Sequence, residues 1–473
     1  ITCPRGDMSG EALKPGALIR LTRKLFPALR DGGSVAGIAE KRRRLSAPAA
    51  AANRASAILR DNPADPDALA ALRILSEIPE YRREVAALAR ASDHRVGSAP
   101  LPEGLRDRPR AVSATRLERF IACPFKDFVA SILKPEEEKE FDLTPRDVGN
   151  FYHAALEAFA RENGERLARM SAEEALAAMD RATGALMEDL ARRAIDDSAV
   201  MRREGARIQS VARKAAGTLV GHLAGSAFSP VALEVEFGRE DGRILLRDVP
   251  LKGRIDRVDA WQDGEKRYLR VIDYKTRGKA VDLAEIYWGL QLQLILYLAA
   301  AVAKGGAPAG VFYFAVEQPL PVTPSRDPEE VRALAEKAEK LDGLVLDDPR
   351  VIEAMTPRPQ AVLGVNPGKG RRSGSLVSGE DLRLLMDHVA ALADGALSGI
   401  RRGETDVLPA TWQGGSACGY CDYQSVCQIA PGLPGAEGRL LPAIRPGEVI
   451  PQLRLGAGLG ADSEDSQTEE TGG

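Results

Sequence analysis

The sequence has 473 residues, 44% of them hydrophobic, which is enough for a sizeable buried core and two or three domains. Its 65 lysine and arginine residues nearly balance 68 aspartate and glutamate residues, so any contact with nucleic acid must come from local basic patches. The sequence lacks a run of about 18 apolar residues and a signal peptide, which excludes a membrane-spanning helix of that kind and predicts a cytoplasmic protein.

The first part of the sequence, residues 1–110, is weakly informative. It begins at Ile1 rather than methionine, as a piece of a longer chain would. Short helical patterns, such as those over Ile19–Leu29 and Asp67–Ile78, predict a mostly helical region. The basic run Lys41–Arg44 is more typical of a solvated helix end than of a phosphate site. The sequence contains no G-x-x-x-x-G-K-[ST] loop for ATP.

A new domain is expected to begin at Ser113, after a proline-rich linker. Thr115 and Glu118 have the spacing of a capping box at a helix start, and apolar residues then recur at helical spacing. Pro124 directly follows Cys123 and should kink or restart that helix.

Helical patterns also cover Val148–Asn163 and most of Ala172–Leu223. The first contains His153, and a lone histidine on a helix is more often a core or surface residue than a ligand. The second carries a basic segment that fits either a DNA channel or an ordinary charged helix face, formed by Arg202, Arg203, Arg207, Arg213 and Lys214. Val231–Phe237 then has the pattern of a strand.

Two further predicted strands, Leu251–Trp261 and Arg267–Thr276, carry the chemistry. The stretch between them contains an Asp-Gly step, a strong signal for an antiparallel hairpin. Side chains two apart share a face, so Asp273 and Lys275 point the same way, and Asp256 can reach the same place from the first strand. Two carboxylates and one ammonium there can hold a divalent metal and orient a water for phosphodiester hydrolysis. The alternative is a solvated hairpin whose charges face water.

After the hairpin, one helix is predicted over Leu283–Ala303, in which Gln293 and Tyr297 lie four apart and therefore side by side. A strand over Ala309–Val316 and a charged helical pattern over Asp327–Asp347 follow.

The remaining sequence alternates between ordered and irregular patterns. Asn366–Ser375 is a basic, glycine-rich loop, and Gly379–Ile400 is the last predicted helix. The chain becomes rich in proline and glycine from about Pro431, and its acidic end, Asp462–Glu470, is expected to be disordered.

Three cysteines, Cys418, Cys421 and Cys427, have the spacing C-x₂-C-x₅-C, which is typical of thiolate ligands to zinc or to an iron–sulfur cluster. Three ligands need a fourth, and Cys123 is the candidate. A metal held by all four would join the beginning and the end of one domain. Cys3 falls outside the pattern and is expected to be an incidental or buried thiol.

Together these motifs resemble the PD-(D/E)XK nuclease superfamily in its RecB-type branch. The resemblance rests on Gly149-x-x-x-His153, Gly-Arg-Ile-Asp256, Asp273-Tyr-Lys275 and Gln293-x-x-x-Tyr297, which occur in the family's order. It implies an α/β fold with a restriction-endonuclease-like core, in which helices flank a central mixed sheet, with added helical segments.

The resemblance also implies roles for individual residues. We expect catalytic roles for Asp256, Asp273, Lys275, Gln293 and Tyr297, metal ligation of Mg²⁺ or Mn²⁺ by His153, Asp256 and Asp273, and DNA contacts by Gln293, Tyr297, Arg254 and Arg257.

The cysteines extend the resemblance. Cys123-Pro-Phe, with the three later cysteines, resembles the 4Fe-4S staple of AddB-type nuclease domains, and zinc in the same four cysteines is the alternative. We therefore predict three parts: residues 1–110 as a partial helicase-like or linker region, residues 111–430 as the nuclease domain with its 4Fe-4S staple, and residues 431–473 as a C-terminal extension.

The function implied is that of a metal-dependent DNA exonuclease domain in an AddB-like subunit. Such a subunit would act with an AddA-like helicase–nuclease partner in double-strand break repair by homologous recombination, hydrolysing the 5′-ended strand. Two alternatives remain open: a stand-alone RecB-like iron–sulfur exonuclease of the CRISPR-adaptation type, and a non-catalytic DNA-binding scaffold subunit. Intact Asp256, Asp273 and Lys275 argue against the scaffold.

Overall fold

The computed structural model describes residues 65–91, 101–106, 109–135, 144–193, 199–238, 244–246, 249–318, 339–365, 375–412, 415–419, 421–429 and 438–457, with a few isolated residues near positions 24, 51–58 and 327–334. The basic run Lys41–Arg44, the acidic end and Cys3 lie outside the described residues, as do nearly all of Ile19–Leu29 and of the loop Asn366–Ser375. The chain divides into two compact units, residues 1–97 with 424–438 and residues 98–423 with 439–473.

In the first unit, two short helices form a small hydrophobic cluster. Helix α4 (Pro66–Glu77) matches the helix predicted over Asp67–Ile78, and the side chain of Asp65 caps its N-terminus. Helix α5 (Pro79–Ala91) follows directly, and its Tyr81 packs against the buried Leu75 of α4.

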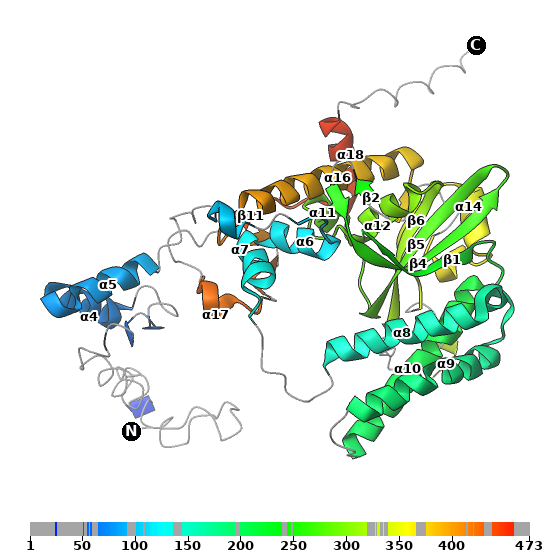
Figure 1. Ribbon diagram of the computed structural model, residues 1–473, viewed down its shortest axis with the longest axis horizontal. Coiled ribbons are helices and arrows are strands. Elements are labelled where there is room, and N and C mark those ends of the chain that lie inside the picture. Colours follow the sequence, from blue (N-terminus) through cyan, green and yellow to red (C-terminus); the bar gives the residue numbers. More distant parts are fainter. Residues whose placement is uncertain are drawn as a thin grey trace, which may run out of the picture. The chain divides into compact units, whose positions relative to one another are not determined.

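The second unit is built on a mixed six-stranded sheet (Figure 1). Its strands, in spatial order, are β1 (Ser229–Phe237), β4 (Gly253–Asp263), β5 (Lys266–Arg277), β6 (Ala307–Glu317), β7 (Asp342–Leu346) and β8 (Leu376–Val377). Strands β1, β4 and β5 are antiparallel neighbours, whereas β6 runs parallel to β5. A parallel neighbour requires a crossover, and the chain between β5 and β6 supplies it as helices.

The two faces of the sheet are covered by different helices (Figure 1). One face packs against α8 (Pro145–Asn163), α9 (Ala172–Arg193), α10 (Ala199–Leu223) and α14 (Pro349–Met355). The other packs against α6 (Ala114–Ala122), α11 (Leu283–Tyr287), α12 (Gln293–Val302), α16 (Gly379–Arg402) and α18 (Pro446–Gly456). Strand β5 alternates accordingly, since Ile272 joins the first core and Val271 the second.

Smaller elements complete the second unit. They are the short helices η1 (Glu103–Leu105), α7 (Pro124–Phe128), η2 (Val129–Leu133), η3 (Gly164–Arg169) and α15 (Pro359–Val362), the paired strands β2 (Ile244–Leu246) and β3 (Val249–Leu251), and a small sheet of β9 (Ala410–Trp412), β10 (Gly415–Ser416) and β11 (Arg439–Leu440). None of the helices in the described ranges is both long and apolar enough to cross a membrane.

Most predicted elements are present, and the predicted hairpin is confirmed as β4 and β5. Asp263 pairs with Lys266, so only two residues form the turn, and Gly264 occupies it with φ +58°. A two-residue turn of this kind favours glycine because it requires positive φ. The stretch predicted between the two strands was too long by three residues, since Gln262 and Asp263 belong to β4 and Lys266 belongs to β5.

Three local predictions were wrong. The helix over Leu283–Ala303 is two helices, because Gly289 adopts φ +80° after α11 and the chain restarts at α12. The charged stretch Asp327–Asp347 ends in the strand β7 rather than in a helix. Ser113, not Thr115, caps α6, and its hydroxyl accepts a hydrogen bond from the Arg116 backbone N–H.

Candidate metal centre

The β4–β5 pair brings the predicted catalytic residues together. Asp256 is buried, and its Oδ2 accepts a 2.7 Å hydrogen bond from the backbone N–H of Tyr274 on β5. Asp273 is buried beside it, and its Oδ2 lies 2.5 Å from the ammonium of Lys275. The expectation that Asp273 and Lys275 share a face and meet Asp256 across the hairpin is therefore confirmed.

His153 reaches this place from α8, a helix on one face of the sheet. Its Nδ1 lies 3.3 Å from Oδ1 of Asp256 and 3.6 Å from Oε1 of Glu234. Ligand atoms of these three residues all lie within 4.8 Å of one another, and within the described ranges they are the sole group of three or more histidine, cysteine or acidic side chains this close. Asp273 is next to the group but outside it.

Two atoms of this group suit a metal. Nδ1 of His153 and Oε1 of Glu234 are buried, and neither makes a well-aligned hydrogen bond to the residues that the structure describes, although Nδ1 lies 3.3 Å from Oδ1 of Asp256. A buried polar atom without a partner costs free energy, which a bound cation would recover. One imidazole nitrogen and several carboxylate oxygens form a donor set that divalent cations such as Mn²⁺ and Mg²⁺ accept.

Glu234 was not predicted as a ligand. Its neighbours pair with β4 as Leu233 with Arg257 and Val235 with Ile255, which places Glu234 opposite Asp256. Its φ is +47°, a left-handed conformation that a side chain other than glycine rarely adopts. Such strain costs roughly 1–3 kcal/mol and tends to occur at functional sites.

Gly149, the glycine of the Gly149-x-x-x-His153 motif, lies where helix α8 passes close to strand β5. A Cβ added to Gly149 would lie 3.2 Å from Oγ1 of Thr276, the residue after Lys275 on β5. Helix α8 thus approaches the end of β5 closely at Gly149, one turn before His153. A side chain at this position would require Thr276 or α8 to shift by a few tenths of an ångström.

Gln293 and Tyr297 complete the site from α12. The amide of Gln293 donates to Oδ1 of Asp273 at 2.7 Å and accepts from Lys275 at 3.2 Å. It also lies 3.3 Å from the Tyr297 hydroxyl, as the four-residue spacing predicted. Gln293 is therefore bound to the two residues of the Asp-x-Lys motif.

Without a bound cation, the pKa values of Asp273 and His153 are both raised, so these two groups tend to hold their protons. Burial, followed by the charge of Asp256, raises the pKa of Asp273 to about 6. Burial alone would lower the pKa of His153, but its interactions with Asp256 and Glu234 outweigh burial and raise that pKa to about 10. At neutral pH a cation must therefore displace a proton from His153.

We predict that divalent metal binding strengthens as the pH rises from 6 to 9. A bound cation needs neutral imidazole and ionised carboxylates, so protons compete with it up to the raised pKa of His153. If one proton is released, affinity should rise by about tenfold per pH unit. Calorimetric titration with Mn²⁺ at pH 6, 7.5 and 9 measures this. A His153→Ala variant should bind more weakly and with a flatter pH dependence, and equal wild-type affinity at all three values would contradict the assignment.

The two arginines expected to contact DNA differ in their surroundings. Arg254 is half exposed, and its Nε lies 2.6 Å from Oε2 of Glu234, at the rim of the centre. Arg257 is 3% exposed, and its guanidinium makes bonds of 2.6 and 2.7 Å to the buried Asp259. Asp259 also binds Arg270, so Arg257 belongs to a buried ion network. The expected DNA contact of Arg257 is not compatible with this burial.

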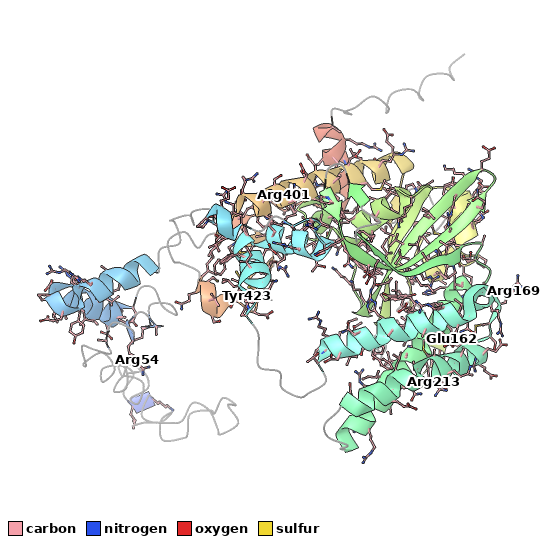
Figure 2. The ribbon with its side chains drawn as sticks, in the orientation of Figure 1. Arg54, Glu162, Arg169, Arg213, Arg401 and Tyr423 are labelled. Atoms are coloured by element: carbon pink, nitrogen blue, oxygen red, sulfur yellow. The ribbon has the colours of Figure 1, made fainter. Side chains whose placement is uncertain are left out.

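The basic segment of α10 is largely neutralised. Arg207 binds Glu204 on its own helix and Glu317 on β6. Arg213, labelled in Figure 2, lies 3.5 Å from Asp180 of α9. Of the two alternatives predicted for this segment, these pairs support the ordinary charged helix face.

Of the four cysteines of the predicted cluster, Cys123 lies at the C-terminal end of α6. Cys123 is buried between α6 and α7, and the Phe125 backbone N–H donates to the Asp406 carbonyl, so the beginning and the end of the domain meet there. Burial raises the pKa of the Cys123 thiol, and among the lesser influences the nearby Cys418 raises it further. Within the second unit, Cys123, Cys418 and Cys421 are not gathered within 4.8 Å. Cys427 ends α17 (Gln424–Cys427) in the first unit.

Comparison with known proteins identifies the class to which this site belongs. A model of the PD-(D/E)XK nuclease superfamily matches residues 111–428, and the chain belongs to this superfamily. The fold class predicted from the sequence, a mixed sheet flanked by helices, is thereby confirmed.

Individual relatives indicate a more specific kind of protein than the superfamily does. The chain is similar to the B subunit of the ATP-dependent helicase/deoxyribonuclease from Moorella thermoacetica, with 32% identity over 93% of this chain and 41% of that protein. It is likewise similar to the proteins of the same name from Symbiobacterium thermophilum (33% identity, 91% of this chain, 40% of that protein) and Desulforudis audaxviator (34%, 76% and 32%). The chain thus spans about two fifths or less of the length of these curated relatives.

Proposed function

We propose that the chain is the nuclease part of an AddB-like subunit and hydrolyses DNA with a divalent metal. The observation that carries this proposal is the convergence of His153, Glu234 and Asp256 beside the Asp273–Lys275 ion pair. Similarity to the B subunits of helicase/deoxyribonucleases supports DNA as the substrate. By the same similarity, the partner is an AddA-like helicase–nuclease subunit, and the process is double-strand break repair by homologous recombination.

The chain's own residues divide the work. His153, Glu234 and Asp256 would hold Mg²⁺ or Mn²⁺, with Asp273 adding a further carboxylate. When bound, such an ion supplies charge that stabilises the phosphate in the transition state and makes water a better nucleophile. Lys275 can orient the attacking water while Asp273 holds its ammonium at 2.5 Å.

Gln293, on α12, holds Asp273 and Lys275 in place. Because it bonds both Asp273 and Lys275, it fixes the two groups relative to each other before substrate arrives. Preorganised polar groups of this kind contribute to rate because they need not rearrange during the reaction. Contact of Gln293 and the half-exposed Arg254 with the DNA strand is part of the proposal, whereas Tyr297 is only 7% exposed, so its expected DNA contact meets the same objection as that of Arg257.

A second group, a 4Fe-4S cluster, is proposed at Cys123, Cys418, Cys421 and Cys427. Cys123 is buried, Cys418 is near enough to influence its charge, and the two ends of the domain meet beside it.

The experiment that tests the function is digestion of a short single-stranded DNA labelled at its 5′ or its 3′ end. We expect cleavage in Mg²⁺ or Mn²⁺ that removes the 5′ label progressively, as the proposed action on the 5′-ended strand requires. Progressive removal of the 3′ label instead would overturn the proposed polarity of cleavage but not the proposed nuclease activity. Tight binding without cleavage would favour the scaffold alternative.

A further inference from the structure

Helix α12 begins without a cap of its own. Leu292 is its N-cap residue and provides no side-chain acceptor, although the first backbone N–H groups of any helix lack partners within it. Gln293 is the first helical residue, so the N–H groups that need an acceptor lie at the start of the helix that carries the Gln293 side chain. The amide of that side chain binds Asp273 and Lys275.

Glu118 supplies the missing acceptor from another helix. Its Oε1 accepts a 2.6 Å hydrogen bond from the N–H of Leu292 and a 2.9 Å hydrogen bond from the N–H of Gln293. Glu118 lies on α6, 175 positions before Gln293, and it is not needed at the start of α6 because Ser113 caps that helix.

The cap that Glu118 provides determines where the Gln293 side chain lies. One carboxylate oxygen binds the N–H of Gln293 itself and that of the preceding residue, which fixes the first turn of α12 against α6. From that turn, the amide spans Oδ1 of Asp273 and the ammonium of Lys275. A shift of the turn would move the amide away from both.

We infer that Glu118 is a positioning residue of the nuclease: by capping α12 it holds Gln293 where it aligns Asp273 with Lys275. The inference rests on the proposed function for its kinetic consequences. It assigns Glu118 no contact with metal or DNA and no proton transfer, so its oxygen matters as an acceptor rather than as a charge.

Two substitutions separate these roles. Glu118→Gln keeps the oxygen that accepts both N–H groups, so kcat should stay within about threefold of wild type. Glu118→Ala leaves both N–H groups without a partner, and kcat should fall by about ten- to a hundredfold, the range for a small misplacement of reacting groups, with an unchanged KM for DNA. A Glu118→Gln variant as inactive as Glu118→Ala would overturn the inference, because it would mean that the charge or the proton matters.

A double-mutant cycle with Gln293→Ala tests the route. If Glu118 acts through Gln293, Glu118→Ala should reduce kcat little further once Gln293 has been replaced, whereas independent effects multiply. A loss of kcat that is as large in the Gln293→Ala background as in the wild type would overturn the inference. Asp348→Ala is the control, since the Asp348 carboxylate also caps a helix, its own helix α14, through the N–H of Arg350, and it should leave kcat unchanged.

Hydrogen exchange makes the test independent of activity. The amides of Leu292 and Gln293 should be protected in the wild type and in Glu118→Gln, and exposed to exchange in Glu118→Ala. If the wild type cleaves no DNA, the proposed function fails, but the exchange pattern still decides whether Glu118 caps α12. Equal protection of both amides in all three proteins would overturn the cap itself.

Discussion

Replacing Asp273 by asparagine is expected to reduce metal-dependent cleavage of single-stranded DNA by about a thousandfold or more, since charge stabilisation by a metal centre amounts to several kcal/mol. The substitution removes the carboxylate that pairs with Lys275 at 2.5 Å and lies beside Asp256, while its amide retains the size needed beside Gln293. The fold should survive, because the change removes a charge that is costly to bury. Single-turnover cleavage and circular dichroism measure the two effects.

Asp263→Ala is the matched control. Asp263 lies on the same hairpin, at the turn between β4 and β5, and pairs with the exposed Arg350 at 3.3 Å. A surface ion pair of this kind contributes little to stability, so both activity and fold should be unchanged. If Asp273→Asn cleaves at the rate of this control, Asp273 has no part in the chemistry.

Replacing Cys123 by serine should have the second large effect, the loss of iron from anaerobically purified protein. If four cysteines hold one 4Fe-4S cluster, the wild type should be brown, with broad absorption near roughly 400 nm from thiolate-to-iron charge transfer. A cluster without one ligand is labile, so Cys123→Ser should do as much damage as replacement of Cys418. Proteolysis should then become easier at α6 and around β9 together, since both lie at this junction.

Cys3→Ser is the natural control for iron content, because Cys3 falls outside the cysteine pattern. It should retain full iron and colour. A colourless wild type that carries one zinc ion, or a Cys123→Ser variant with full iron content and wild-type protease resistance, would show that the proposed cluster is absent.

Local patterns in the sequence were sufficient to predict the centre of the site. The Asp-Gly step and period-two alternation predicted the β4–β5 hairpin, and the same period placed Asp273 and Lys275 on one face. The four-residue spacing on a helix placed Gln293 beside Tyr297. These are short-range geometric facts, and tertiary structure rarely alters them.

Long-range contacts could not be predicted in the same way. Glu234 meets His153 and Asp256 because the register of β1 against β4 sets it opposite Asp256, and no local pattern specifies that register. Glu118 has the spacing of a local capping box, but its side chain caps a helix that begins 175 positions later. A motif of this kind indicates an acceptor without indicating which helix it serves.

The remaining errors came from backbone and charge context. Gly289 ended a helix that otherwise has an uninterrupted apolar pattern, because the left-handed conformation it adopts is accessible to glycine. Arg257, expected at the surface, pairs with the buried Asp259 instead. Buried arginines are rare and are normally paired, which a sequence alone does not reveal.

Cleavage of single-stranded DNA before and after removal of the divalent ion tests whether this chain cleaves DNA with an ion held at its own residues. We predict cleavage by the wild type in Mn²⁺ or Mg²⁺, arrest by EDTA, and recovery when excess metal is added. Lys275→Ala, which removes the ammonium paired with Asp273, should remain inactive throughout. Cleavage that continues in EDTA, or that proceeds at the wild-type rate in Lys275→Ala, would contradict the claim.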